Sequence, residues 1–357
     1  MSGLNRKDVK HLMLISGRSH PELAKEVAGL LDTTLVPTRM VTYANSEIYV
    51  RYEKTVRGCD AFVLQAHVGR IDDYSVNDYL MEQLIMIDAL KRASAKRITV
   101  VSPFYPYARQ DKKHAGREPV SARLVADLFA TAGATRIMTV DLHASQIQGF
   151  FNGPVDHLTA MPILADYVEG KYDLGDVVVV SPDAGRVRLA DQWAERLGCP
   201  LAIIHKRRDP NVAHQVAMYE VVGKVGNKTC LLVDDMIDTA GTICLAAEAL
   251  RAHGAKRVVA AATHPVLSGP AAERLNAGRI EEVIVTNTLP IAPTTRIDNL
   301  TVLSIASLLS KAISTVFAER SVEAIMDAYV PKHLREKNVP ARQEPCPAED
   351  PGPGTSR

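Results

Sequence analysis

The sequence predicts a parallel α/β fold divided into two domains. Its 357 residues are more than a single domain usually holds. Along the chain, short runs rich in β-branched residues alternate with segments of helical periodicity, which is the pattern of parallel sheets flanked by helices. A helix–turn–strand segment also recurs further along the chain, about one domain length away.

Apolar and β-branched runs define the expected strands, and amphipathic periodicity defines the expected helices. Strands are expected at Leu12–Ser16, Ala61–Gln65, Ile98–Ser102, Ile137–Asp141, Val177–Ser181, Ala202–His205, Thr229–Val233, Val258–Thr263 and Glu282–Thr286. Helices are expected at Pro21–Leu31, Val76–Lys91, Ser121–Thr131, Arg186–Leu197, Gly241–His253 and Ile305–Phe317. The second of these helices has apolar residues three and four positions apart, which predicts a buried face.

The internal repeat joins a helix end, a turn and the next strand. Ala89–Lys91 and Ala95–Ile98 recur as Ala249–Arg251 and Ala255–Val258, an offset of 160 residues. Chance is one explanation, because such residues are common at these joints, but an offset of about one domain favours a duplication. The second copy has an acidic loop between its strand and helix, whereas the first has Gln65–Asn77 there. We therefore expect catalysis in the second half.

The chain is expected to divide at 153/154, into an N-terminal domain of residues 1–153 and a C-terminal domain of residues 154–330. The boundary falls near Asn152–Pro154. Residues 331–357 are polar and rich in proline, and such a composition cannot bury a core. We expect this tail to be disordered.

Composition and charge narrow the class of protein. The formal net charge is +1, without the basic excess of a nucleic-acid binder, so we expect no nucleic-acid partner. Five scattered cysteines without a C-x-x-C pair argue against a disulfide framework or a zinc knuckle and fit a reducing cytosol. The apolar stretch Leu12–Ile15 is too short for a signal peptide, and no segment approaches the ~18 apolar residues of a membrane span. We therefore expect a cytoplasmic protein with no membrane partner.

The most specific feature of the sequence is the loop that ends at Thr242. The apolar strand at 229–233 ends in Asp234 and Asp235, small residues follow, and a helix begins at Gly241. Small residues let the backbone fold closely around a ligand, and the unpaired N–H groups of a helix start can bind phosphate. Two adjacent carboxylates suit sugar hydroxyls or a cation. The simpler interpretation, that Asp234 and Asp238 only cap the helix, explains one acid but not three.

The run Val233–Thr242 resembles the ribose-phosphate loop of two families, the type I phosphoribosyltransferases and the ribose-phosphate pyrophosphokinases. The resemblance implies an α/β fold of two tandem type I phosphoribosyltransferase-like domains with pseudo-twofold symmetry. It also implies that one group of residues binds ribose 5-phosphate: Asp234, Asp238, Thr239, Ala240, Gly241 and Thr242.

Two further segments favour the pyrophosphokinases. Tyr105–Lys113 looks like their ATP-binding segment, in which the residues matching Arg109 and Gln110 contact the nucleotide. Tyr43–Glu47 is similar to a second ATP loop, and this resemblance implies ATP contacts from Asn45, Ser46 and Glu47. In that family the loop reaches the active site of a neighbouring subunit, which implies self-association, as a homohexamer built from dimers. Taken alone, Asn45 is simply a turn residue.

His143 and Asp183 are the candidate metal ligands. Each follows the carboxyl end of a predicted strand, where α/β sheets place their ligands. A lone histidine is more often structural, and it is the family resemblance that makes this pair a site for a divalent ion. So few protein ligands leave most positions to water and phosphate, which suits Mg²⁺. The loop from Asp183 also resembles the family's pyrophosphate loop, whose commonest version has a glycine where this chain has Arg186.

Lys206 and Arg208 are the candidate catalytic residues. They lie in a run of cations after a predicted strand, and such a run alone is usually a solvated turn. In the pyrophosphokinases the matching segment opens a catalytic loop, and its cations stabilise the transferring phosphoryl group. The resemblance also places Arg208 at ribose 5-phosphate.

The reaction that the resemblance implies is transfer of pyrophosphate from Mg-ATP to the C1 hydroxyl of ribose 5-phosphate, for nucleotide biosynthesis. No side chain stands out as a general base. Two alternatives remain open at this point. One is a phosphoribosyltransferase that consumes the product, which the ATP-like segments oppose. The other is a non-catalytic regulatory relative, which the retained Lys206, Arg208, His143 and Asp183 oppose.

Overall fold

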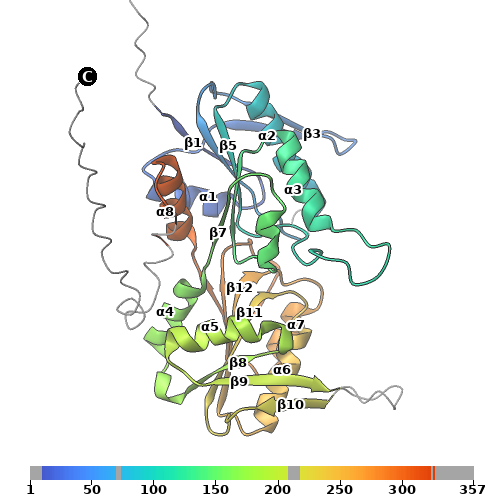
Figure 1. Cartoon of the computed structure of the whole chain (residues 1–357), viewed down its shortest axis with the longest axis vertical. Helices are drawn as coiled ribbons and strands as arrows, with labels where there is room; N and C mark the ends of the chain where they lie inside the picture. The colour runs from blue at the N-terminus through green and yellow to red at the C-terminus, as the bar shows by residue number, and fades with distance from the viewer. Residues whose placement is uncertain (1–9, 70–73, 208–217, 323–324, 326–357) are drawn as a thin grey trace, which may run out of the picture.

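A computed structural model describes residues 10–69, 74–207, 218–322 and 325, in two α/β halves stacked along the long axis of the molecule (Figure 1). The first half is built on a five-stranded sheet of order β1-β4-β5-β6-β7 in which every pairing is parallel. Its strands are β1 (Leu12–Ser16), β4 (Asp60–Leu64), β5 (Arg97–Ser102), β6 (Arg136–Val140) and β7 (Val155–Leu158). Its helices are α1 (Pro21–Leu30), α2 (Val76–Arg92) and α3 (Ser121–Ala132). A separate antiparallel hairpin consists of β2 (Thr38–Thr42) and β3 (Ile48–Tyr52).

The second half is built on a seven-stranded sheet of order β10-β9-β8-β11-β12-β13-β14, antiparallel only between β9 and β10. The strands are β8 (Val177–Ser181), β9 (Leu201–Arg207), β10 (Met218–Val222), β11 (Thr229–Ile237), β12 (Arg257–Pro265), β13 (Glu282–Thr286) and β14 (Leu300–Leu303). The helices are α4 (Met161–Lys171), α5 (Val187–Leu197), α6 (Gly241–Ala252) and α7 (Ala271–Ala277), and α8 (Ala306–Phe317) follows β14 but packs on the first half.

Every strand and helix expected from the sequence is present, with ends that shift by a few residues. The largest shift is in β11, which continues through the two aspartates to Ile237. The hairpin, β7, β10, β14, α4 and α7 were not expected. β7 and β14 have four residues each and α7 has seven, so these elements are too short for periodicity alone to detect.

The two halves exchange their last helices. After β7 the chain crosses to the second half, where α4 packs beside α5 in one core with Leu164, Val168 and Trp193. After β14 it returns to the first half, where α8 packs against α1 through Leu308, Leu309 and neighbouring apolar residues. Figure 1 shows α8 beside α1 and α4 beside α5.

The exchange also shows where the chain passes from the first sheet to the second half, which is after β7. Because β7 pairs with β6, the first sheet continues to Leu158, beyond the boundary expected at 153/154. The first half also includes α8, which comes from the far end of the chain. The tail expected to be disordered, residues 331–357, lies outside the described residues.

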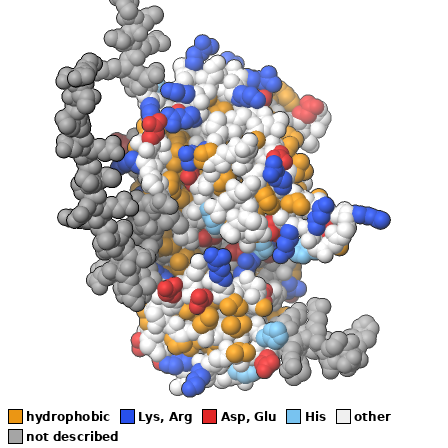
Figure 2. Space-filling model, in the orientation of Figure 1, with side chains coloured by type: hydrophobic (Ala, Val, Ile, Leu, Met, Phe, Trp, Pro, Cys, Tyr) orange, Lys and Arg blue, Asp and Glu red, His pale blue; other side chains and the backbone are white. Residues whose placement is uncertain are grey.

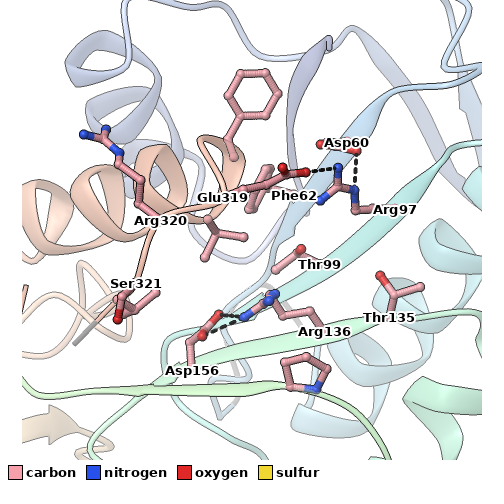
Figure 3. Close-up of a pocket in the computed structure, with 14 residues that line it drawn as sticks. Asp60, Phe62, Arg97, Thr99, Thr135, Arg136, Asp156, Glu319, Arg320 and Ser321 are labelled. Atoms are coloured by element: carbon pink, nitrogen blue, oxygen red, sulfur yellow. Dashed lines mark hydrogen bonds and ion pairs between the residues drawn. The ribbon is translucent and has the colours of Figure 1, made fainter. Parts of the chain in front are cut away.

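The segment after α8 closes a cavity of about 670 Å³ at the amino ends of β4, β5 and β6 (Figure 3). Arg97 pairs there with Asp60 at 3.2 Å and with Glu319 at 2.7 Å. Arg136 pairs with Asp156 through two contacts of 2.8 Å. The Arg97–Glu319 pair fastens the C-terminal segment to the first sheet, at the end opposite to the candidate site described below, and the Arg136–Asp156 pair joins β6 to the β7 edge.

Among the described residues, no helix combines the length and the apolar character that crossing a membrane requires. The four described cysteines are buried and unpaired: Cys59, Cys199, Cys230 and Cys244.

Candidate active site

A cavity of about 850 Å³ lies between the two halves, at the carboxyl ends of their strands. Its walls come from the loops after β5, β6 and β8 and from the end of β11, so both halves contribute. Figure 2 shows histidine, acidic and basic side chains close together around the waist of the molecule. The cavity brings together several residues predicted from the sequence: Arg109, His143, Asp183 and Asp234.

The acidic pair of β11 holds an arginine. Arg186 Nε lies 2.9 Å from Asp234 Oδ1, and its Nη2 lies 2.8 Å from Asp235 Oδ1. His143 Nδ1 lies 2.7 Å from Asp235 Oδ2 and also 2.7 Å from Arg186 Nη2. The Asp235 side chain is only 7% exposed. Two adjacent carboxylates are therefore buried beside a single guanidinium and an imidazole.

Burial and neighbouring charges drive the two carboxylates apart in proton affinity. Burial, reinforced by Asp235, raises the pKa of Asp234 well above its ordinary value. Burial also acts to raise the pKa of Asp235, but the hydrogen bond from His143 and the charge of Arg186 outweigh it and hold that pKa below its ordinary value. Asp235 thus carries the more firmly held negative charge of the pair.

The donor set fits a divalent cation that keeps much of its water. Asp235 Oδ1 is buried and lies 2.8 Å from Arg186 Nη2, but within the described part of the chain no donor meets it with the geometry of a hydrogen bond. Asp183 uses Oδ1 to accept from the backbone N–H groups of Gly185, at 2.8 Å, and Arg186, at 3.1 Å. No group of three or more potential ligands is assembled among the described residues. An ion would therefore take few protein ligands and complete its shell with water and phosphate oxygens.

The loop between β11 and α6 connects the two halves. Asp238 Oδ2 accepts from Arg109 Nη1 at 2.7 Å, and Ser268 Oγ donates to Asp238 Oδ1. Arg274 Nη1 donates to Thr239 O at 3.0 Å. A β-carbon at Gly241 would come within 3.3 Å of Arg274 Nη1, so glycine leaves room for that guanidinium.

The start of α6 suits an anion. Ala240 precedes the helix in the left-handed region, at φ 58°, and no side chain caps the helix. The first N–H groups of α6 therefore remain without a side-chain acceptor. The interpretation in which Asp234 or Asp238 caps this helix is wrong, because Asp238 binds Arg109 and Ser268 instead.

A smaller cavity of about 380 Å³ adjoins this loop. Phe104, Tyr107 and Val266 give it apolar and aromatic walls, and Arg109 and Gln110 line it as well. Gln110 is held in place because its Oε1 accepts from Ser121 Oγ at 2.6 Å and its carbonyl accepts from Ala122 N at 3.1 Å. Such walls suit a flat apolar or aromatic group.

Some predicted residues lie away from both cavities or outside the described residues. Asn45, Ser46 and Glu47 form the turn between β2 and β3 and line neither cavity. Asn45 Oδ1 accepts from Glu47 N at 3.2 Å, as a turn residue does. The backbone of Lys206 belongs to β9, but its side chain, and all of Arg208, lie outside the described residues.

Other residues of the site were not predicted. Ser268, Arg274 and Thr263 come from segments after or within β12, and nothing in their sequence spacing marks them. Thr263 Oγ1 donates to Asp141 Oδ2 at 2.6 Å, which also accepts from Ala160 N at 2.9 Å.

Comparison with known proteins identifies the family. A protein named ribose-phosphate pyrophosphokinase from Streptomyces coelicolor is 59% identical to this chain, over 92% of this chain and 99% of its own length. The chain belongs to the ribose-phosphate pyrophosphokinase family. A relative of the same name from Corynebacterium efficiens is 57% identical over 90% of this chain and 98% of its own.

Two family descriptions and a solved structure agree with this assignment. Residues 12–133 match the N-terminal domain of ribose phosphate pyrophosphokinase, and residues 210–326 match the phosphoribosyl synthetase-associated domain. The crystal structure of phosphoribosylpyrophosphate synthetase from Mycobacterium smegmatis superposes with a TM-score of 0.81 at 58% identity, over 87% of this chain and 99% of that one. The tandem α/β architecture expected from the resemblance is thereby confirmed for this ribose-phosphate pyrophosphokinase family member.

Proposed function

We propose that the cavity between the two halves is where this chain performs the reaction of its family. Ribose-phosphate pyrophosphokinases transfer the pyrophosphoryl group of ATP to the C1 hydroxyl of ribose 5-phosphate. The products are 5-phosphoribosyl 1-pyrophosphate and AMP, and the first of these supplies nucleotide biosynthesis. The observation that carries the assignment of the site is the Arg109–Asp238 ion pair, which joins the ATP-like segment to the ribose-phosphate loop.

Ribose 5-phosphate would place its phosphate on residues 238–242, where the uncapped N-terminus of α6 offers N–H donors. Its ring hydroxyls would donate to Asp234, which lies at the end of β11 in the larger cavity. The Thr239 and Thr242 hydroxyls would add donors to the phosphate. This orientation leaves the C1 hydroxyl facing the nucleotide.

ATP would place its base in the smaller cavity beside Arg109 and Gln110. The C1 oxygen then attacks the β-phosphorus in line, a C1–O–P bond forms, and the bond from that phosphorus to the bridging oxygen of AMP breaks. Lys206 and Arg208 would neutralise charge on the transferring group. Asn45, Ser46 and Glu47 would reach the ATP of a neighbouring subunit.

Mg²⁺ is the ion we propose for this site, held by His143 and Asp183, with Asp235 beside them. When bound, it would neutralise the phosphate oxygens of the nucleotide. The position of the hairpin turn outside the cavities of its own chain supports self-association, which we propose as a homohexamer built from dimers. We place the enzyme in the cytoplasm, where its substrates are made.

The test is to follow AMP formation from Mg-ATP, with and without ribose 5-phosphate. AMP that depends on ribose 5-phosphate, without ADP, is the expected result. Production of ADP would mean that the β-phosphorus is not the point of attack. Release of pyrophosphate only when a nucleobase and the phosphoribosyl product are supplied would favour the salvage alternative. Binding of both substrates without turnover would favour a regulatory protein.

A further inference from the structure

Arg186 occupies the place where substrate and metal are expected to bind, and this inference rests on the function proposed above. Its guanidinium lies 2.9 Å from Asp234 Oδ1 and 2.8 Å from Asp235 Oδ1, with its side chain 19% exposed. The residue ends a short 3-10 helix, Ala184–Arg186, and its backbone N–H is held by Asp183. The side chain thus extends from the loop of one candidate metal ligand onto the carboxylates of β11.

The buried acidic pair lies against a cation. Asp234 and Asp235 are adjacent in sequence, and their side chains are 17% and 7% exposed, so water screens their mutual repulsion poorly. The charge of Arg186 lowers the repulsion between them and is the cation that the described residues supply at this point. Without a bound ion, the guanidinium serves in its place.

The contacts of Arg186 are nevertheless mutually incompatible. His143 Nδ1 lies 2.7 Å from Asp235 Oδ2 and 2.7 Å from Arg186 Nη2. One ring nitrogen cannot donate to the carboxylate and accept from the guanidinium at the same time, so one contact is always unmade. Asp235 Oδ1 also lacks a hydrogen bond within the described ranges, in spite of the nearby guanidinium. A divalent ion that displaced the guanidinium would relieve both, because His143 Nδ1 would keep only its contact with Asp235, and Asp235 Oδ1 would face a cation in place of Arg186.

We propose that Arg186 is a built-in counter-ion that neutralises the acidic pair in the empty enzyme and is displaced when a divalent cation and ribose 5-phosphate bind. Arg186 is therefore a positioning residue that competes with the metal. The affinity of the metal for the empty enzyme is lower than the carboxylates alone would give, because the ion must first displace the guanidinium. Binding of metal is thereby coupled to binding of the sugar, which uses the same oxygens.

The experiment measures Mn²⁺ binding by electron paramagnetic resonance of the free ion, in the absence of both substrates. Arg186→Gln is expected to bind Mn²⁺ about 10-fold more tightly than the natural chain, because the competing charge is gone. The rise in melting temperature on adding metal should also be larger in the variant. An affinity within twofold of the natural chain, or a lower one, overturns the proposal.

Controls separate this effect from a general change of charge or a loss of fold. Arg196→Gln removes one arginine from α5, the helix that follows Arg186, where it pairs with Asp166, and should leave Mn²⁺ binding unchanged. Adding Asp235→Asn to Arg186→Gln should abolish the gain. If Arg186→Gln does not fold, Arg186→Lys, which cannot span both carboxylates with one fork, should still bind Mn²⁺ a few-fold more tightly. No change in that variant also overturns the proposal.

The readout does not depend on turnover. Failure of the AMP assay in the natural chain would reject the proposed reaction while leaving the Mn²⁺ result interpretable. If the natural chain forms AMP but Arg186→Gln binds Mn²⁺ with unchanged affinity, the proposed reaction stands and only the counter-ion proposal is rejected.

Discussion

The two halves of the chain share one framework but differ in what fills the carboxyl ends of their strands. β1, β4, β5, β6 and β7 correspond in order to β8, β11, β12, β13 and β14. In the first half Leu64 pairs with Val101, and in the second Val233 pairs with Ala261. Val101 and Ala261 stand at the 160-residue offset of the sequence repeat, whereas the last residues of the preceding strands are 169 residues apart. Gln65 therefore stands where the second half has Asp234.

In the first half the corresponding position is filled by its own side chains. Gln65 is fully buried and donates through Nε2 to Glu82 Oε1 at 2.8 Å, while its Oε1 accepts from Ser19 Oγ at 2.5 Å. Arg18, in the loop after β1, pairs with Glu82 at 2.5 Å. A β-carbon at Gly17 would lie only 2.2 Å from Gln65 Oε1, so the Gln65 side chain fills the space beside this backbone.

The second half has the same kind of arginine but more acid than that arginine can satisfy. Arg186 follows β8 as Arg18 follows β1, and it faces two carboxylates where Arg18 faces one. Matched polar groups make a structural network, whereas an excess of carboxylate makes a site that still requires a cation or a sugar. The shared framework thus holds a network of mutually satisfied polar side chains in the first half and an excess of carboxylate in the second.

In both halves a side-chain oxygen accepts a hydrogen bond from the backbone where the chain crosses to the other half. Asp141 Oδ2 accepts from Ala160 N at 2.9 Å, and Asn287 Oδ1 accepts from Ile305 N at 2.8 Å. The two acceptors, Asp141 and Asn287, come directly after β6 and β13. The two donors, Ala160 and Ile305, come directly before α4 and α8. The exchange of helices therefore has an equivalent hydrogen bond at each crossing.

The largest expected effect lies in strands that the first half lacks. β9 and β10 have no counterpart in the first sheet, and β9 carries Lys206. Lys206→Ala should lower kcat by about 10³-fold or more, because a cation on the transferring phosphoryl group is removed. ATP binding should be largely spared. Single-turnover rates and nucleotide binding, measured on the same preparation, check this, and full activity would refute the role.

The next prediction compares a substitution of Asp234 with a substitution of Gln65, the residue at the corresponding position of the first half. Asp234→Asn should lower kcat/KM by about 10²-fold while leaving stability unchanged or higher, because it removes repulsion from the buried pair. Gln65→Leu should do the opposite: about 1–3 kcal/mol of stability is lost through unpaired Glu82 and Ser19, with normal activity per folded molecule. Steady-state kinetics and urea unfolding compare the two, and equal effects would contradict the division of roles.

Arg18 tests the buried ion pair of the first half. The Glu82 side chain is fully buried, whereas that of Arg18 is 28% exposed. Arg18→Met leaves the carboxylate without its charge partner and should cost about 3 kcal/mol, at the lower end for breaking a buried pair because of the exposed arginine. Adding Glu82→Gln should recover part of the loss. A loss below 1 kcal/mol in urea unfolding would show that the network does not depend on charge.

The smallest effect concerns pH. His67 stands where the second half has Met236, and burial lowers the pKa of His67 to about 4, below its ordinary value of 6.5. Because the unfolded chain binds this proton more readily, the stability contributed by the neutral ring is complete above pH 6.5 and is lost as pH falls towards 4. The loss should approach about 2–3 kcal/mol by pH 4.5.

His67→Met should reduce that dependence. Two other buried histidines, His20 and His264, and the partly buried His157 also have pKa values lowered by burial and keep part of the slope. Urea unfolding at pH 7 and pH 4.5 measures the difference between the natural chain and the variant. An unchanged difference would show that His67 does not titrate on unfolding.

The sequence by itself determined the framework and the chemistry of the loop. Central strands such as Val177–Ser181 and Glu282–Thr286 were predicted at their observed ends, because a continuous apolar run is the direct consequence of burial on both faces. The acidic loop before α6 was recognisable for a similar reason. A ligand loop at the end of a strand is a local feature, and its residues are adjacent in sequence.

Only the tertiary structure decided which distant residues meet. The edge strands β7 and β14 have weak patterns, and no periodicity shows that the helix after each one packs on the other half. The contact of Arg186 with Asp234 and Asp235 joins segments almost fifty residues apart. Periodicity records which face of an element is buried but not what lies against it. Side-chain partners therefore emerge only on folding, whether within one half, as for Arg186 and Asp234, or between the halves, as for Arg109 and Asp238.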